Sequence, residues 1–185
     1  MEEGSFLHPP KAIAAAGVHE GMHVADFGSG SGFFTRAAAR AVGEGGVVWA
    51  VDVHQDLLPR IKNLAAAENL HNVEVVHGNV EVSGGSNLPA EQFDLVIAAN
   101  LLFAAEHKRE VVAEMRRVLK KNGRALVIDW SDSFGGLGPH PDHVLTVQAG
   151  RELFEQGGFT YVGDISAGAY HWGFIIRKNT NSGAQ

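Results

Sequence analysis

A glycine-rich turn between an apolar run and a helical pattern is the feature that most limits the fold. Residues 24–33 read Val-Ala-Asp-Phe-Gly-Ser-Gly-Ser-Gly-Phe, so Gly28, Gly30 and Gly32 alternate after Asp26. This order predicts a buried strand, a tight turn and the start of a helix. Glycine permits backbone angles and close approaches that a β-carbon forbids. Ligands of open α/β sheets bind outside the carboxyl ends of the strands, so the turn predicts a small-molecule site.

The spacing of the turn limits which ligand it can hold. Dinucleotide-binding turns follow the pattern G-x-G-x-x-G, whereas this turn reads G-x-G-x-G and Phe33 stands where the last glycine would be. The charge of Asp26, two residues before the first glycine, would oppose a pyrophosphate. Beside an ammonium or sulfonium the same charge is favourable by roughly 1–4 kcal/mol. The turn therefore favours a cationic adenosine cofactor over NAD.

Strand and helix patterns alternate along the rest of the chain. Near-continuous apolar runs are typical of parallel strands that are covered on both faces. Helices are predicted over residues 9–16, 33–42, 56–67, 106–120 and 147–156, the last capped by Thr146. Parallel strands are predicted over residues 22–27, 47–52, 73–77, 93–99 and 124–130, and a closing antiparallel pair over 159–165 and 169–177. The chain is therefore expected to be an α/β protein.

A second acid ends the second predicted strand. Asp52 lies about 20 residues beyond the glycine turn, the position from which an acid reaches ribose hydroxyls. A solvated acid at a strand end is the alternative. His54 follows two residues later and either flanks an adenine or is an ordinary loop histidine.

The pattern Asp26-x-Gly28-x-Gly30-x-Gly32 resembles motif I of the class I S-adenosylmethionine-dependent methyltransferases. Asn100-Leu101, after the fourth strand, resembles motif IV of the same family. The resemblance implies a Rossmann-like, doubly wound sheet of seven strands, mostly parallel with an antiparallel pair at the C-terminus. It also implies S-adenosylmethionine (SAM) as cofactor and S-adenosylhomocysteine (SAH) as product. The cofactor residues expected on this basis are Asp26, Gly28, Ser29, Gly30, Gly32, Phe33, Asp52, Val53, His54, Gly78, Asn79, Val80, Asn100 and Leu101.

One of these positions departs from the family. Methyltransferases of this class usually carry an acid after the third strand, where it meets the adenine amino group, and here the residue is Asn79. An amide can accept or donate a hydrogen bond, so the contact stays possible. Within the class, the chain looks most like the small stand-alone (type 11) enzymes near the ubiquinone/menaquinone-biosynthesis methyltransferases. Ile128-Asp129-Trp130, Gly138-Pro139 and Tyr170-His171-Trp172-Gly173 resemble a bacterial and archaeal subgroup of mostly undefined substrate.

No residue is singled out as the catalytic base. A general base assists methyl transfer when the acceptor is a hydroxyl or a protonated amine, and each candidate can equally be a cap, a surface group or a core residue. The loop 131–145 carries two of them and is interpreted as a substrate lid, with a metal site as the alternative. The candidates are His107, Asp129, His140, His143, Tyr170 and His171.

Composition narrows the remaining possibilities. The 185 residues predict one domain. It is divided into an N-terminal helix or lid (1–20), a core (21–178) and a flexible tail (179–185). The tail is part of a polar stretch that begins at Lys178. In the first part, Phe6, His8 and Pro9 either close over the cofactor or belong to a packing helix. The absence of cysteine excludes disulfides, thiolate metal sites and a cysteine nucleophile, and argues against arsenic methylation. No metal site is therefore assigned.

Charge and hydropathy bear on partners and location. The net charge of −6 gives no general footprint for nucleic acid. The acidic start Met1-Glu2-Glu3 is unlike a signal peptide, and no apolar run approaches the length of a membrane span. A soluble, cytoplasmic enzyme with a small-molecule acceptor is expected, of undetermined oligomeric state.

Three alternatives stay open at this stage. A nicotinamide oxidoreductase is disfavoured by the glycine spacing and by Asp26. A binding module that keeps the cofactor pocket without chemistry is compatible with the sequence, because the catalytic residues are unidentified. A methyltransferase acting on RNA or protein would need a local basic patch.

Overall fold

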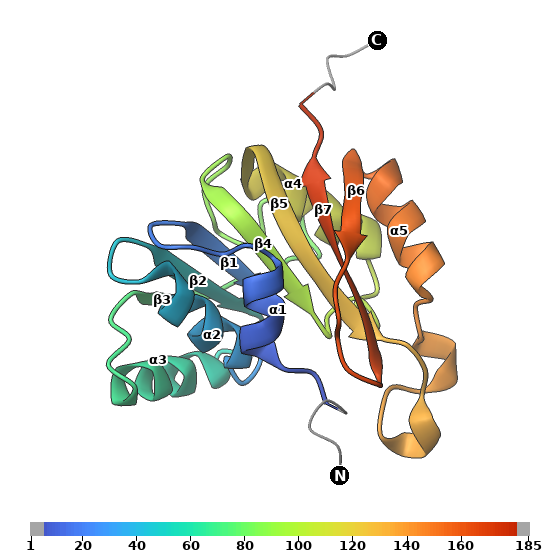
Figure 1. Ribbon diagram of the computed structural model, residues 1–185, viewed down its shortest axis with the longest axis horizontal. Helices are drawn as coiled ribbons and strands as arrows, with labels where there is room; N and C mark the ends of the chain where they lie inside the picture. Colours follow the sequence, from blue (N-terminus) through green and yellow to red (C-terminus); the bar gives the residue numbers. More distant parts are fainter. Residues whose placement is uncertain (1–5, 181–185) are drawn as a thin grey trace.

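Seven strands form one sheet in the computed structural model, which describes residues 6–180. The sheet order is β3-β2-β1-β4-β5-β7-β6 (Figure 1). The strands are β1 (His23–Phe27), β2 (Val47–Asp52), β3 (Val73–His77), β4 (Phe93–Ala99), β5 (Leu119–Trp130), β6 (Phe159–Asp164) and β7 (His171–Lys178). The helices are α1 (Pro9–Ala15), α2 (Phe33–Val42), α3 (Leu57–Ala67), α4 (Lys108–Val118) and α5 (Val147–Gln156), with short 3₁₀ turns η1 (Phe134–Gly136) and η2 (Pro141–His143).

The topology creates a crevice beside β1. Strand β1 pairs in parallel with β2 on one side and with β4 on the other. The chain first adds strands toward β3, and then crosses back to β4 and continues toward β5. Strand β7 lies antiparallel between β5 and β6. The predicted seven-stranded α/β fold is confirmed, and the order reverses between β1 and β4, where ligands of doubly wound sheets bind.

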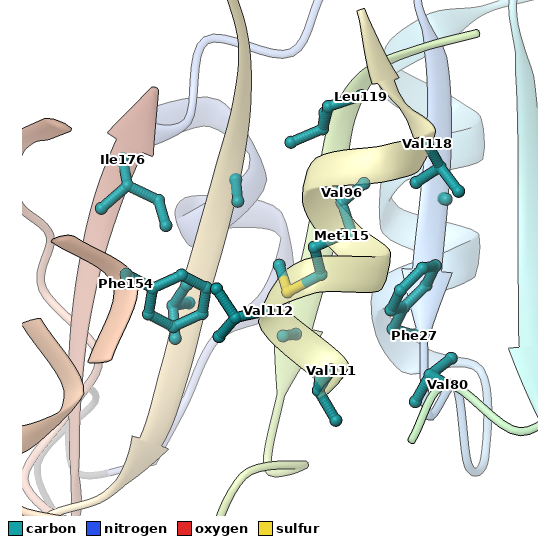
Figure 2. Packing of buried hydrophobic residues seen from close by; sticks show 14 of the residues in the cluster. Phe27, Val80, Val96, Val111, Val112, Met115, Val118, Leu119, Phe154 and Ile176 are labelled. Atoms are coloured by element: carbon teal, nitrogen blue, oxygen red, sulfur yellow. The ribbon is translucent and has the colours of Figure 1, made fainter. Parts of the chain in front are cut away.

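Helices cover both faces of this sheet. Alternate residues of β1, β4 and β5 belong to two hydrophobic clusters, one on each face. One cluster includes α1, α2 and α3, and the other includes α4 and α5. Figure 2 shows α4 of the second cluster, whose Val112 and Met115 are fully buried beside the sheet. Within residues 6–180, no helix is long and apolar enough to cross a membrane.

The boundary between α4 and β5 differs from the prediction. The expected helix reached Lys120 and ended at Asn122-Gly123, but α4 ends at Val118 and β5 begins at Leu119. Leu119 has an extended backbone and pairs with Phe93, and the register then shifts so that Leu95 meets Arg124. Asn122, with φ of 62°, lies within this irregularity. The Asn-Gly pair therefore serves a bulged strand start instead of a helix end.

Lys178 also departs from its predicted place at the start of a polar tail. It is the last residue of β7 and is buried, and its Nζ donates to the carbonyl of Leu119 at 2.6 Å. The amine also lies 3.4 Å from a carboxylate oxygen of Glu91. The side chain thus ties β7 to the irregular start of β5. Residues 181–185 of the predicted tail lie outside the described part of the chain.

A buried acid fixes the loop between β3 and β4. Glu114 on α4 is 1% exposed and accepts hydrogen bonds from the backbone amides of Gly84 and Ser86, from the Ser86 hydroxyl and from Arg117. Burial alone would raise the pKa of this carboxyl, but the bonds from Arg117, Ser86 and Gly84 lower its pKa to about 2. One carboxylate therefore holds the loop against the helix.

Replacing Glu114 by glutamine is expected to lower the free energy of unfolding by about 2–3 kcal/mol at pH 7, because an amide cannot accept all these bonds. The folded pKa lies below the unfolded one, so the stabilisation is complete above about pH 4.5 and is lost toward pH 2. Urea unfolding at pH 7 and pH 3 measures both effects. Glu110→Gln, on the exposed side of α4, is the control; equal losses in the two variants would contradict the prediction.

Candidate cofactor and active site

The glycine turn is held in place by the neighbouring strand. The amides of Gly28 and Ser29 both donate to the carbonyl of Val51, at 2.9 and 3.1 Å. Gly28, Gly30 and Gly32 have φ of 67°, 51° and 74°. These left-handed angles are costly for residues with a β-carbon, which explains the alternate glycines. Gly32 is also the N-cap of α2, so the turn leads directly into the helix.

The three glycines differ in what surrounds them. A β-carbon at Gly28 would lie 2.8 Å from Leu101 Cδ1, and one at Gly32 would lie 3.0 Å from Ile61 Cγ1. A β-carbon at Gly30 would meet nothing closer than the Gly28 carbonyl at 3.9 Å. Gly28 and Gly32 therefore allow close packing, whereas Gly30 keeps a space open.

That space belongs to a pocket of about 480 Å³ at the crevice between β1 and β4. One wall is the turn itself, and the other comes from the end of β4 and the segment that precedes α1. Six of the predicted cofactor residues lie in this lining: Asp26, Gly28, Ser29, Gly30, Phe33 and Asn100. The full lining is Leu7, Pro9, Asp26, Gly28, Ser29, Gly30, Ser31, Phe33, Phe34, Ala99 and Asn100.

Asp26 is more deeply buried than a strand-end acid would suggest. It is 2% exposed, and its Oδ2 accepts from the Thr35 hydroxyl at 2.6 Å. Burial raises the pKa of Asp26 to about 7, against the lowering effect of the hydrogen bonds from Thr35. Without a ligand, the Asp26 carboxyl is therefore fully ionised only above neutral pH, whereas the sequence argument assumes a full negative charge. A nearby cation would lower this pKa and restore the charge.

Asp52 links the second strand to the turn. Its Oδ2 accepts from the amide of Gly30 at 2.8 Å, and its Oδ1 accepts from the amide of His54 at 2.9 Å. A carboxylate has about four lone-pair sites, so each oxygen can accept a further hydrogen bond from a ligand. The acid thus shapes the turn and keeps capacity for hydroxyl donors.

The end of β4 forms the opposite side of the crevice. Asn100 has φ of 54°, and its backbone amide donates to the backbone carbonyl of Ile128 at 2.9 Å. Asparagine tolerates this left-handed conformation better than most residues. The chain then turns so that Leu101 packs over Gly28.

The residues after β2 and β3 lie beside the turn but outside this pocket. The Gly78 amide donates to the Asp52 carbonyl at 3.1 Å, which holds the two strand ends together. Val53, His54 and Asn79 are exposed. The side-chain oxygen of Asn79 accepts from the Glu81 amide at 2.9 Å, so its NH₂ group is left for a ligand.

Val80 is placed differently from its neighbours. Its side chain is 7% exposed and belongs to the hydrophobic cluster that includes Phe27 (Figure 2). Only its backbone is therefore suited to meet a ligand.

Comparison with known proteins adds an independent observation. A family model described as a methyltransferase domain matches residues 18–158. The chain belongs to this methyltransferase family. The match includes the glycine turn, Asp52 and the end of β4, and it confirms the predicted membership of the class I SAM-dependent methyltransferases.

Individual proteins agree with this assignment. The ubiquinone/menaquinone biosynthesis C-methyltransferase UbiE of Burkholderia vietnamiensis is 35% identical over 120 residues, which are 64% of this chain and 47% of that protein. The chain thus aligns with about half the length of such curated relatives. The crystal structure of a SAM-dependent methyltransferase from Aquifex aeolicus has a TM-score of 0.84 and 26% identity, covering 93% of this chain and 90% of the other.

Fold alone does not settle the chemistry of such a methyltransferase. The [4+2]-cyclase SpnF matches with a TM-score of 0.78 at 16% identity, over 94% of this chain and 80% of the cyclase. The acceptor side of the site has therefore to be examined residue by residue.

Asp129 is a buried structural acceptor in this methyltransferase. Its two oxygens accept from the amides of Phe103 and Trp130, at 3.1 and 2.8 Å. Burial raises the pKa of Asp129 to about 6, although these backbone bonds lower it in part. The carboxyl lies on the face of the sheet that α4 and α5 cover. Through its bond to Phe103 it holds the segment after β4 in place.

The other candidate bases fall into two groups. His107, His140 and His143 are exposed, and His140 Nδ1 lies 3.3 Å from an oxygen of the equally exposed Asp142. Residues 6–180 contain no cluster of three or more His, Cys, Asp and Glu side chains suited to a metal. Tyr170 and His171, by contrast, lie against other aromatic rings at the end of β5.

Thr35, which donates to Asp26, was not predicted from the sequence, and neither were four pocket residues: Leu7, Ser31, Phe34 and Ala99. Thr35 gave a weak signal, as a polar residue within the apolar pattern of a helix. Leu7 gave none, because its place depends on the path of the chain before α1. Pro9 was named only as part of a lid, and it does line the pocket.

Proposed function

We propose that the protein transfers a methyl group from SAM to a small-molecule acceptor and releases SAH. The observation that carries this proposal is the pocket beside the glycine turn, where a buried carboxylate lies near an unpartnered hydroxyl. Ser29 lines the pocket, and its Oγ is buried and has no hydrogen-bond partner among the described residues. Buried polar atoms are rarely left without a partner, and the amino-acid part of SAM offers both an ammonium and a carboxylate. The residues present therefore fit this cofactor.

Each part of SAM has a matching group in the proposal. Asp26, Ser29 and Asn100 take the amino-acid end, and the open side of Gly30 admits the ligand close to the backbone. Asp52 accepts from the ribose hydroxyls. His54 and the NH₂ group of Asn79 are left for the adenine, together with the backbone at 78–80.

The mechanism follows from what these residues can do. When bound, SAM supplies a methyl group on a positively charged sulfur. The protein's task is to hold the acceptor in line with that methyl, and such alignment can contribute several kcal/mol to the rate. Leu7 and Pro9 cover one side of the pocket, where their apolar side chains help to exclude water. Residues 6–20 thus act as the lid in this proposal, and residues 1–5 of the predicted lid lie outside the described part of the chain.

The alternatives receive less support. A nicotinamide cofactor would need a glycine at Phe33 and would place its pyrophosphate near Asp26. The UbiE relatives are about twice as long as the matched region, so their acceptor is not transferred to this chain. A cytoplasmic location remains a prediction, as do the single-domain division and the oligomeric state.

Calorimetry with SAM, SAH and NAD tests the cofactor. We expect SAM and SAH to bind and NAD to bind far more weakly; tight NAD binding without SAH binding would overturn the proposal. Methyl transfer from labelled SAM into a fractionated cell extract tests the acceptor. Label in RNA or protein instead of metabolites would overturn the small-molecule assignment, and SAH binding without any labelled product would favour a binding module.

Gly30→Ala tests the open side of the turn. A β-carbon there adds backbone strain of about 1–2 kcal/mol and enters the pocket, so we expect the SAH affinity to fall about 10-fold or more. Gly21→Ala is a matched control, because Gly21 has φ of 85° and equally open surroundings at the other end of β1. Both variants should lose similar stability in thermal unfolding, and only Gly30→Ala should lose affinity in calorimetry. Equal affinities would show that the ligand does not approach Gly30.

A further inference from the structure

One face of the sheet carries a row of side chains that continues from the pocket. Ile97, Ile128 and Ile175 belong to the hydrophobic cluster on the face covered by α1, α2 and α3. Side chains alternate along a strand, so Ala99 of β4, Trp130 of β5 and His171 of β7 lie on this same face. Trp130 and His171 are direct partners in the β5–β7 register.

The spacing of this row is set by the sheet. Neighbouring strands lie about 4.8 Å apart, and β7 is two strands from β4. His171 lies two strands across and two residues along from Ala99, so their backbone positions are about 12 Å apart. The side chain of His171 spans part of that distance, so an acceptor beside it can place its attacking atom between the imidazole ring and the methyl group.

His171 has an unusual environment for a histidine in this row. Both of its ring nitrogens are buried and neither has a hydrogen-bond partner among residues 6–180. Its ring lies 4.3 Å from that of Trp130. A neutral imidazole needs one donor and one acceptor, and few native polar groups are left unsatisfied in this way. The fold therefore leaves the hydrogen-bonding capacity of both nitrogens unused.

Three separate segments meet at Tyr170, the residue before this histidine. The ring of Tyr170 lies 5.5 Å from Phe6 and 4.9 Å from Phe134. The backbone of Phe6 lies so close to Gly168 that a β-carbon there would be 2.9 Å away. In Figure 1 the N-terminal segment, the β6–β7 hairpin and the loop after β5 lie together at the lower edge of the view, near the carboxyl ends of β4 and β5. The rings of Phe6, Tyr170 and Phe134 hold these three segments together.

The other candidate bases are less well placed. Asp129 projects from the opposite face, and both its oxygens already accept backbone hydrogen bonds. His107, His140 and His143 are exposed. Burial lowers the pKa of His171, which favours the neutral ring with a free lone pair.

We propose that His171 is the general base for an acceptor that carries a proton on its attacking oxygen or nitrogen. The inference rests on the proposed methyl transfer. In the step, the attacking atom forms a bond to the methyl carbon while the carbon–sulfur bond breaks and its electron pair stays on sulfur. The proton of the attacking atom moves to the free ring nitrogen of His171 and is later released to water. Trp130 keeps the imidazole ring in place.

Two substitutions of His171 test this role. His171→Phe keeps a flat ring against Trp130 and removes both nitrogens, and His171→Gln keeps hydrogen-bonding groups but cannot take the proton. General base catalysis contributes about 10²–10⁴-fold. We therefore expect both variants to form the labelled product at least about 100-fold more slowly at saturating acceptor, with SAH affinity within about two-fold of the wild type. His71→Phe, at an exposed histidine before β3, is the control and should leave both readouts unchanged.

Thermal unfolding provides a second readout. His171→Phe removes two unsatisfied buried atoms, so its melting temperature should equal or exceed that of the wild type. A clearly lower melting temperature would show that the nitrogens serve the fold, and would overturn the proposal. Unchanged product formation in His171→Phe would also overturn it while leaving the proposed function intact. If the wild type binds neither SAM nor SAH, the proposed function itself fails, and the role of His171 fails with it.

Discussion

Replacing Asp52 by alanine is expected to weaken SAH binding by about 100-fold or more. The substitution removes the acceptor for the ribose hydroxyls, and a hydrogen bond to a charged group contributes about 1.5–3 kcal/mol. It also removes the acceptor of the Gly30 and His54 amides, so the turn itself loses its connection to β2. Calorimetric titration with SAH measures the affinity, and thermal unfolding measures the separate cost to the fold.

Two further variants make this result specific. Asp52→Asn keeps one oxygen, which can accept from only one of the two amides, so an intermediate loss of affinity is expected. Asp56→Asn removes the same charge four residues later, from a side chain that makes no capping hydrogen bond to α3. If Asp56→Asn lost as much SAH affinity as Asp52→Asn, the loss would come from the change in net charge and not from a contact of Asp52 with the ligand.

Replacing Asp26 by asparagine is expected to stabilise the protein at pH 8 and to weaken SAM and SAH at least about 10-fold. The folded pKa of about 7 exceeds the unfolded value of 3.8. Between these values the unfolded chain releases its proton first, so stability falls as the pH rises and then levels off above pH 7. The full shift corresponds to a cost of at most about 4 kcal/mol at pH 8. The uncharged amide avoids this cost and can still accept from the Thr35 hydroxyl.

Urea unfolding of both proteins at pH 4 and pH 8 tests the stability effect. The stability gained by Asp26→Asn should be present at pH 8 and nearly absent at pH 4. A gain of equal size at both pH values would show that ionisation of Asp26 is not the cause. Calorimetry with SAM and SAH tests the second effect, and unchanged affinities would show that no cationic group lies beside Asp26. Gains in stability that reduce function are common at sites shaped for binding.

The sequence was most informative where local chemistry determines the structure. The bounds of α2, β2, β3 and β4 were predicted because glycines or apolar runs mark both ends. The start of β5 was not, because Leu119 pairs with Phe93, a residue distant in the chain. The burial of Lys178 depends in the same way on the position of Leu119.

The candidate site shows the same division. Its glycines and the position of Asp52 follow from spacing alone. The protonation of Asp26 does not, because it depends on how completely the surrounding residues exclude water. His171 was one of six equal candidates until the sheet register placed it on the same face as the pocket. Contacts between distant segments decide such properties, and a pattern within one segment does not record them.

The hydrogen bonds within the glycine turn have a consequence for selectivity in the cell. The amides of Gly28 and Ser29 donate to Val51, that of Gly30 donates to Asp52, and that of Gly32 donates to Ser29. Phosphate-binding turns work by pointing free amides at the anion, and these four amides are already engaged. Abundant nucleotides such as ATP share the adenosine group of SAM but would find these four amides unavailable to their phosphates. The turn thus offers the phosphates of such competitors fewer donors than a phosphate-binding turn does.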